Sequence, residues 1–162
     1  MECVFYTPGY TMFKRMNTME KDAERVRSVS GNQSNIEVDS QILFNLEFYK
    51  SEGKRAIEAR IEELDREWDI ERTLEANAAA LALTGTLLGA FVNRRFLALP
   101  ALVAAFLAQH AVQGWCPPVP IFRKMGVRTR PEIDREKYAL KALRGDFRNV
   151  DDSQEAWTAV NT

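Results

Sequence analysis

Two apolar stretches, residues 76–92 and 96–115, are the strongest constraint on how this chain folds, because only Asn93, Arg94 and Arg95 separate them. Charged residues make up 28% of the chain, yet neither stretch contains an Asp, Glu, Lys or Arg. At a helical rise of about 1.5 Å per residue, the stretches would extend about 26 Å and 30 Å, close to the hydrocarbon thickness of a bilayer. Residues 76–115 therefore predict a transmembrane hairpin of two helices.

The chain before this hairpin divides into two parts. Residues 1–39 are rich in small and polar residues without a helical period, so we expect them to be largely disordered. Residues 40–75 predict amphipathic cytoplasmic helices, the first of them capped by Ser40. The second has an apolar seam at spacings of four, three and four residues, formed by Ile57, Ile61, Leu64 and Trp68.

The chain after the hairpin predicts a basic cytoplasmic turn and helix, residues 116–148, and a polar tail, residues 149–162. Thr129 and Glu132 match a capping box, Pro131 fits the first turn of a helix, and Gly145 is a natural stop. This segment is basic and the helix before the hairpin is acidic, so the two can form exposed ion pairs worth at most about 1 kcal/mol each. The predicted fold class is all-α: a two-helix transmembrane hairpin, amphipathic cytoplasmic helices on both sides of it, and a disordered N-terminus.

Basic residues are distributed unevenly around the hairpin, and this asymmetry predicts its orientation. The connecting turn holds Arg94 and Arg95. Many more lie near the outer ends, namely Lys54, Arg55, Arg60, Arg66, Arg72, Arg123, Lys124, Arg128, Arg130 and Arg135. Because basic residues favour the cytoplasmic side of a membrane, we expect both termini in the cytoplasm and a lipid bilayer around residues 76–115.

Charge and residue content exclude several classes of protein. A formal net charge of -1 argues against a nucleic-acid partner, which requires a concentrated basic surface. The two cysteines, Cys3 and Cys116, are too few for a disulfide framework and fit a reducing compartment. The sequence has no paired histidines for a metal and no serine with a histidine base, so we expect no catalytic residues, no metal site and no cofactor.

Small residues follow one face of each predicted transmembrane helix. Gly85 and Gly89 form a Gly-x-x-x-Gly pair, which Ala78 and Ala82 extend. The second helix offers a matching stripe of Ala101, Ala105 and Ala108. Such faces let helices approach closely, so these surfaces either join the two legs of the hairpin or join copies of it in a homo-oligomer.

One polar pair is expected across the hairpin. Reflecting the two legs about Arg94 places Asn77 and His110 at about the same depth, where their side chains could meet. A proton-linked role is one interpretation, because imidazole titrates near neutral pH. The other is a polar pair that satisfies its own hydrogen bonds near the interface.

The least generic sequence is Gly114-Trp115-Cys116-Pro117-Pro118, followed by Gly126-Val127-Arg128-Thr129. With the hairpin, these residues resemble the YgaP-like transmembrane domain family over roughly residues 71–129. The resemblance implies a two-helix domain of the bacterial inner membrane whose function is poorly defined. In some members the domain is attached to a rhodanese sulfurtransferase domain, which makes sulfur chemistry at Cys116 an alternative. Here the region before the hairpin is too short and too helical for a rhodanese domain.

Three functions are compatible with these observations. The first is a non-enzymatic inner-membrane protein, a membrane anchor or interaction module whose cytoplasmic helices dock each other or a cytoplasmic protein partner. The second is a thiol-dependent accessory in sulfur metabolism that uses Cys116 as a thiol carrier, although an apolar structural cysteine is the competing interpretation. The third is a soluble helical oligomer in which the hairpin is the core.

Overall fold

The computed structural model describes residues 25–148 and 150–161, and within these residues the chain is entirely helical apart from its connections. The helices are α2 (Arg25–Val29), α3 (Asn32–Glu52), α4 (Lys54–Arg66), α5 (Ile70–Phe91), the 3-10 helix η1 (Arg94–Leu97), α6 (Ala98–Gln113), α7 (Val119–Lys124), α8 (Arg130–Arg144) and α9 (Ser153–Asn161). The predicted all-α class is therefore confirmed for the described residues.

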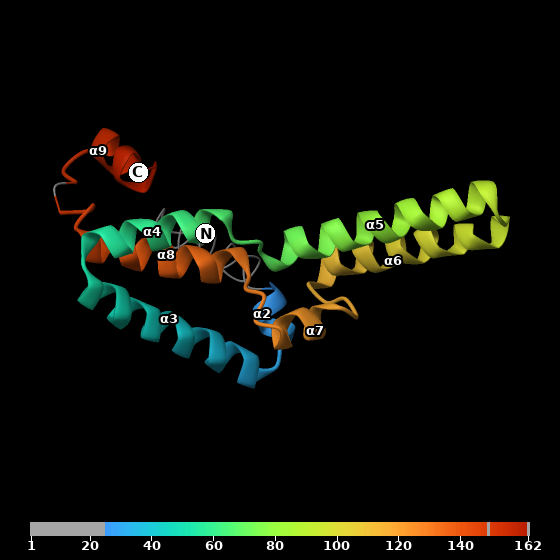
Figure 1. The fold of residues 1–162 in the computed structure, drawn as a ribbon, viewed down its shortest axis with the longest axis horizontal. Helices are drawn as coiled ribbons and strands as arrows, with labels where there is room; N and C mark the ends of the chain where they lie inside the picture. The colour runs from blue at the N-terminus through green and yellow to red at the C-terminus, as the bar shows by residue number, and fades with distance from the viewer. Residues whose placement is uncertain (1–24, 149, 162) are drawn as a thin grey trace, which may run out of the picture.

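The molecule is elongated, with two parts that differ in packing (Figure 1). Helices α3, α4 and α8 pack against one another and form what we call the helical body. Helices α5 and α6 lie side by side, run in opposite directions, and project away from the body to the turn at η1. The short helices α2 and α7 lie where the α5–α6 pair meets the helical body.

The apolar centre of the helical body lies between α4 and α8. It contains Ile57, Ile61 and Leu64 from α4 together with Ile133 and Leu140 from α8. The first three of these residues are the apolar seam expected from their spacing. Trp68, the fourth, is 49% exposed and lies in the break between α4 and α5, because α4 ends at Arg66.

Capping side chains explain where two of the helices begin. Thr129 and Glu132 form the predicted capping box of α8, with each side chain bonded to the backbone amide of the other residue, and Gly145 ends the helix in the left-handed conformation. The carboxylate of Asp69 accepts a hydrogen bond from the backbone amide of Arg72 at 2.8 Å. Helix α5 therefore begins at Ile70, several residues before its apolar stretch, and one helix carries both a charged turn and the apolar segment.

Two predictions about the N-terminal part of the chain are wrong. Residues 25–29 and 32–39, expected to be disordered, are helical, and Ser40 lies inside α3 rather than at its start. Residues 153–161, expected to be a polar tail, form α9, which the Lys141 ammonium holds by donating to the carbonyls of Ala159 and Val160. Residues 1–24, including Cys3, lie outside the described residues.

Candidate functional site

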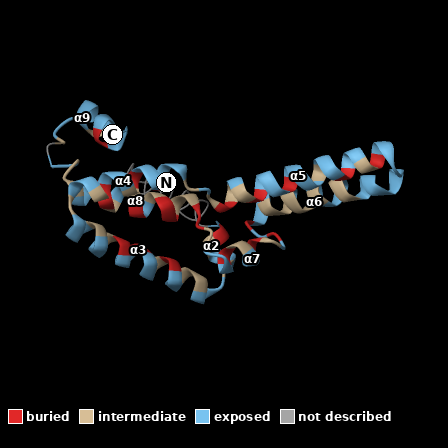
Figure 2. Cartoon of the chain, in the orientation of Figure 1, coloured by how far each residue is buried: buried red, intermediate tan, exposed pale blue. Residues whose placement is uncertain are grey.

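The α5–α6 pair exposes most of its apolar side chains. No residue of η1 or α6 is buried, and α5 buries only small residues beyond its second turn (Figure 2). The large side chains that remain exposed are Leu81, Leu83, Leu87, Phe91, Val92, Phe96, Leu97, Leu102 and Val112. Soluble monomers rarely expose contiguous apolar patches of more than a few hundred Å². Large exposed apolar surfaces of this kind are typical of sites that contact a membrane or another protein.

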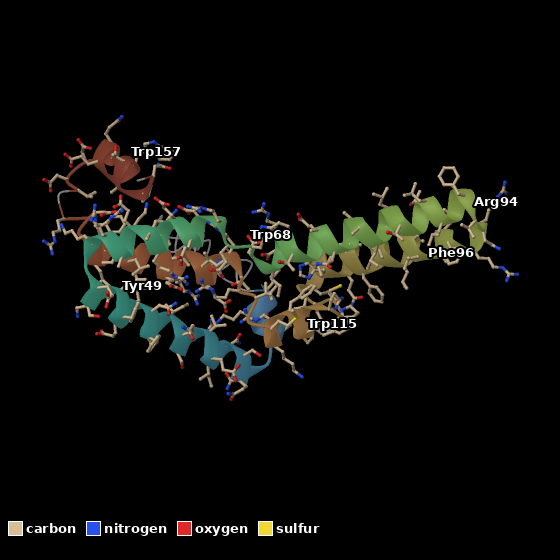
Figure 3. The ribbon with its side chains drawn as sticks, in the orientation of Figure 1. Tyr49, Trp68, Arg94, Phe96, Trp115 and Trp157 are labelled. Carbon is tan, nitrogen blue, oxygen red and sulfur yellow. The ribbon has the colours of Figure 1, made fainter. Side chains whose placement is uncertain are left out.

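Length and composition allow both segments to cross a membrane. One segment ends at Phe91, and the other extends over residues Arg94–Gln113. Their far end carries Arg94 beside Phe96, and their near end lies close to Trp68 and Trp115 (Figure 3). The guanidinium of Arg72 stacks over the Trp68 ring, with 4.5 Å between its central carbon and the ring centroid.

The predicted glycines lie where α5 meets the start of the second leg. A Cβ atom at Gly85 would come within 2.7 Å of Cδ of Pro100, and one at Gly89 within 2.5 Å of Cδ2 of Leu97. Ala78 is buried on the same helix and Ala82 is half-buried. The small-residue stripe of α5 therefore packs within the molecule and accommodates bulky side chains from the second leg.

The second predicted stripe lies elsewhere. Ala101, Ala105 and Ala108 are all exposed, so they do not form the contact between the two legs of the hairpin, and a contact between copies through this stripe stays a prediction. The physical reason is volume, because the space left by Gly85 and Gly89 is filled by Leu97 and Pro100 rather than by alanines.

Among the described residues, no hydrogen bond joins the predicted polar pair, Asn77 and His110. The amide of Asn77 is exposed and donates to the carbonyl of Thr73 at 2.7 Å, one turn back in its own helix. Nδ1 of His110 is buried and, within the described part of the chain, has no hydrogen-bond partner. The nearby backbone carbonyl therefore replaces the imidazole as the partner of Asn77.

Cys116 lies at a tight corner between α6 and α7. Gly114 ends α6 with a φ of +71°, and a Cβ there would come within 2.7 Å of Cβ of Arg25. Cys116 follows in an apolar cluster with Val26, Ile70, Leu74 and Val119. Burial raises the pKa of the Cys116 thiol. Because the thiolate is the reactive species, these surroundings favour a structural cysteine over a thiol carrier.

An ion-pair cluster centres on two buried glutamates of α8 in the helical body, and its basic residues come from this body and from α2, α7 and the segment before α8. Arg123 donates to both carboxylate oxygens of Glu132, at 2.6 and 2.8 Å, and Arg27 of α2 donates to it at 2.9 Å. One turn further along α8, Glu136 accepts hydrogen bonds from Arg60, Arg128 and Asn45. Arg128 also binds both carboxylate oxygens of Glu67.

The arginines keep both buried glutamates ionised. Burial alone would raise the pKa of Glu132, but hydrogen bonds from Arg123 and from the amide of Thr129 outweigh it, so the pKa lies below its usual range. Burial likewise acts to raise the pKa of Glu136, and hydrogen bonds from Arg60 and Arg128 lower it overall. The ion pairs between the two flanking segments are thus buried, and the expectation of weak exposed pairs is wrong for this cluster.

Sequence reasoning identified Glu132 only as a capping residue and missed Glu136. The available signal was the four-residue spacing that places both on the face of α8 that holds Ile133 and Leu140. Two acidic residues on an apolar face indicate buried charges with basic partners.

Among the residues that the structure describes, no three His, Cys, Asp or Glu side chains are grouped so as to hold a metal ion. Searches against protein-family models, curated proteins and solved structures find no match for this chain.

Proposed function

We propose that this chain is a non-enzymatic membrane protein whose α5, η1 and α6 cross a bilayer as a helical hairpin. One observation carries the proposal: two neighbouring segments long and apolar enough to span a membrane leave their large apolar side chains uncovered. A core helix of a soluble protein passes the same length test but is mostly buried. Helix α6 buries no residue, which favours lipid as its surroundings.

The distribution of side chains along the hairpin supports an orientation. Trp68 and Trp115 lie near one end of the hairpin, and indole rings favour a membrane interface, which supports an interface at this end. Arg94 and Arg95 lie at the opposite tip, and most basic residues lie on the side of the helical body. We therefore propose that the helical body and both termini lie in the cytoplasm of a bacterium and that the hairpin spans its inner membrane.

Membership in the YgaP-like transmembrane domain family is part of this proposal. Three residues that carry the resemblance have structural roles in this chain. Gly114 and Gly126 adopt positive φ values of +71° and +84°, and Thr129 caps α8. These positions shape the corner that returns the chain from α6 to the helical body.

The helical body would serve as the interaction module of this anchor. Helix α3 contacts α4 and α8 through one face and exposes an apolar strip on another, formed by Ile36, Leu43, Phe44 and Phe48. A cytoplasmic protein partner or a second copy of the chain could cover this strip. The burial of Cys116 counts against the alternative of a thiol-dependent accessory in sulfur metabolism.

Extraction of cell membranes tests the proposal directly. We expect the full chain to stay with the membrane pellet after alkaline carbonate and high salt, and to dissolve only in detergent. Release without detergent would contradict a spanning hairpin and favour the soluble oligomer in which these helices are the core.

Orientation needs a second measurement. Single cysteines at Arg94 and Ser153, introduced into a chain with Cys3→Ser and Cys116→Ser, would be labelled in intact cells with a membrane-impermeant maleimide. We expect labelling at residue 94 and none at residue 153 until the cells are opened. Labelling at both positions, or only at residue 153, would contradict the proposed topology.

A further inference from the structure

An apolar cavity of about 230 Å³ lies at the base of the α5–α6 pair, where α7 folds back against it. Its walls come from three parts of the chain: Leu74 and Leu81 of α5, Phe106 and Leu107 of α6, and Cys116 and Phe122 of the following corner and α7. Neither the ion-pair cluster nor the glycine contacts of the hairpin involve these six residues.

The cavity has a closed inner end and an open outer end. Leu74 and Cys116 are only 3% and 4% exposed, so they form the inner end. Leu81 is 51% exposed and Asn77 is also exposed, so both lie on the open side of the cavity. Seven residues separate Leu74 from Leu81, which corresponds to about 10 Å along the helix. The cavity is therefore a slot along the hairpin axis.

The lining selects an apolar occupant. Asn77 provides the one amide of the lining, and its Nδ2 already donates to the carbonyl of Thr73. A cavity of about 150 Å³ lined by aliphatic and aromatic side chains stays dry and binds small apolar molecules such as benzene. This slot is larger, so it is suited to several linked methylene groups.

We propose that the slot binds one acyl chain of a membrane lipid. Leu81 lines the slot and is itself one of the exposed apolar side chains of the α5–α6 pair, as is Leu102 of α6. A chain could therefore pass from the bilayer into the slot without crossing water. This inference rests on the proposed function, because it requires the hairpin to lie in lipid. In this proposal, Phe122 of α7 and the corner residue Cys116 line a lipid-binding site.

Photocrosslinking in vesicles tests this site on the full chain. The vesicles would contain phosphatidylcholine and phosphatidylglycerol, with a fraction of the phosphatidylcholine carrying a diazirine in one acyl chain. After illumination, mass spectrometry would locate the adducts. We expect adducts at the inner residues Leu74 and Phe122 as well as at the lipid-facing Leu83.

Matched variants separate a bound chain from general contact with lipid. Ala78 is buried and lines the slot, so Ala78→Phe fills it, whereas Ala80→Phe adds the same side chain at an exposed position of the same helix. We expect loss of the Leu74 and Phe122 adducts in A78F, and the wild-type pattern in A80F. Phe106→Ala enlarges the slot and should increase both adducts, which provides a test independent of whether A78F folds.

Different results would contradict different parts of the proposal. Absence of Leu74 and Phe122 adducts in wild type, with Leu83 labelled, would refute the lipid slot and leave the spanning hairpin intact. Equal inner labelling in wild type, A78F and F106A would also refute the slot. If neither Leu83 nor the inner residues are labelled and carbonate releases the protein, the membrane function itself fails. A slot occupied by a second copy would show protein dimers in place of lipid adducts, which also overturns the inference.

Discussion

Nε of Arg60 on α4 donates a hydrogen bond to the buried carboxylate of Glu136 on α8 at 3.0 Å. The amide of Asn45 on α3 donates to the same oxygen at 2.9 Å. One carboxylate thus connects the three helices of the helical body. A buried charge without a partner is energetically costly. Removing one residue of this cluster should therefore destabilise the fold by more than the energy of the single hydrogen bond that is lost.

Neutralising Glu136 should destabilise the helical body strongly. Glu136→Gln keeps the shape of the side chain but removes the buried anion that pairs with Nε of Arg60 and with Arg128, which retain only Glu63 and Glu67 as anionic partners. We expect a loss of about 3 to 5 kcal/mol in the free energy of unfolding. Urea titration of the detergent-solubilised chain, followed by circular dichroism, measures this loss.

A matched substitution on the same helix provides the control. Asp134 pairs with Arg130 at 3.0 Å, but the two side chains are 35% and 42% exposed. Asp134→Asn should therefore change stability by less than about 1 kcal/mol. If both variants lose the same free energy of unfolding, the burial of Glu136 is not the reason for its contribution to stability.

The ion-pair cluster should make the helical body sensitive to acid. The pKa values of Glu132 and Glu136 are lower in the folded chain than in the unfolded one, so the unfolded chain binds protons first as pH falls. Their stabilisation is therefore complete above the unfolded value of about 4.3 and is lost as pH drops through the folded pKa values. The urea concentration at the midpoint of unfolding should be constant near neutral pH and should decrease once the pH enters this acidic range.

A double variant attributes this pH dependence to the cluster. Glu132→Gln with Glu136→Gln removes both titrating groups, so stability should be lower throughout and should decline less steeply with acid. An unchanged slope would mean that other carboxylates cause the acid sensitivity. Asp146, whose pKa the Arg144 guanidinium lowers, would be the next group to test.

Local signals in the sequence predicted much of the fold, while contacts between distant residues explain what they missed. The α8 capping box and the α4 seam depend on residues within a few positions of each other, so both could be read from spacing. Helix α2 and the start of α3 depend on Arg27, which pairs with Asp39 and with Glu132, over 100 residues away. The lipid-sized slot likewise arises only where α7 meets α5 and α6.

Gly114 should be essential for the corner after α6. It has a φ of +71°, and a Cβ there would lie 2.7 Å from Cβ and 2.9 Å from the backbone carbonyl carbon of Arg25. Gly114→Ala should cost about 1 to 3 kcal/mol through strain and should displace α2. Hydrogen exchange should then increase in α2 and in the last turn of α6. Gly31→Ala is the control, because Gly31 has a φ of −62° and nothing within 4 Å of an added Cβ.

The Cys116 thiol should react slowly in the folded protein. Burial raises its pKa and limits access, and both effects reduce attack by the thiolate. In a Cys3→Ser chain, we expect slow modification by a charged disulfide reagent near neutral pH and rapid modification after unfolding in urea. Met125→Cys, at a position 72% exposed, should react rapidly in a chain without the other cysteines. Fast reaction of native Cys116 would instead revive the thiol-carrier alternative.

Gly89 should control the contact between the two legs of the hairpin. A Cβ at this position would come within 2.5 Å of Cδ2 and 2.7 Å of Cγ of Leu97, so a larger side chain must push α5 away from the start of the second leg. Gly89→Leu should therefore destabilise the hairpin by about 1 to 3 kcal/mol, as overpacking does. Ala90→Leu adds similar apolar volume at the next, exposed residue and should have little effect. Titration from dodecyl maltoside into sodium dodecyl sulfate measures both variants, with loss of helix packing followed by tryptophan fluorescence. An equal response from the two variants would show that the glycine contact does not hold the legs together.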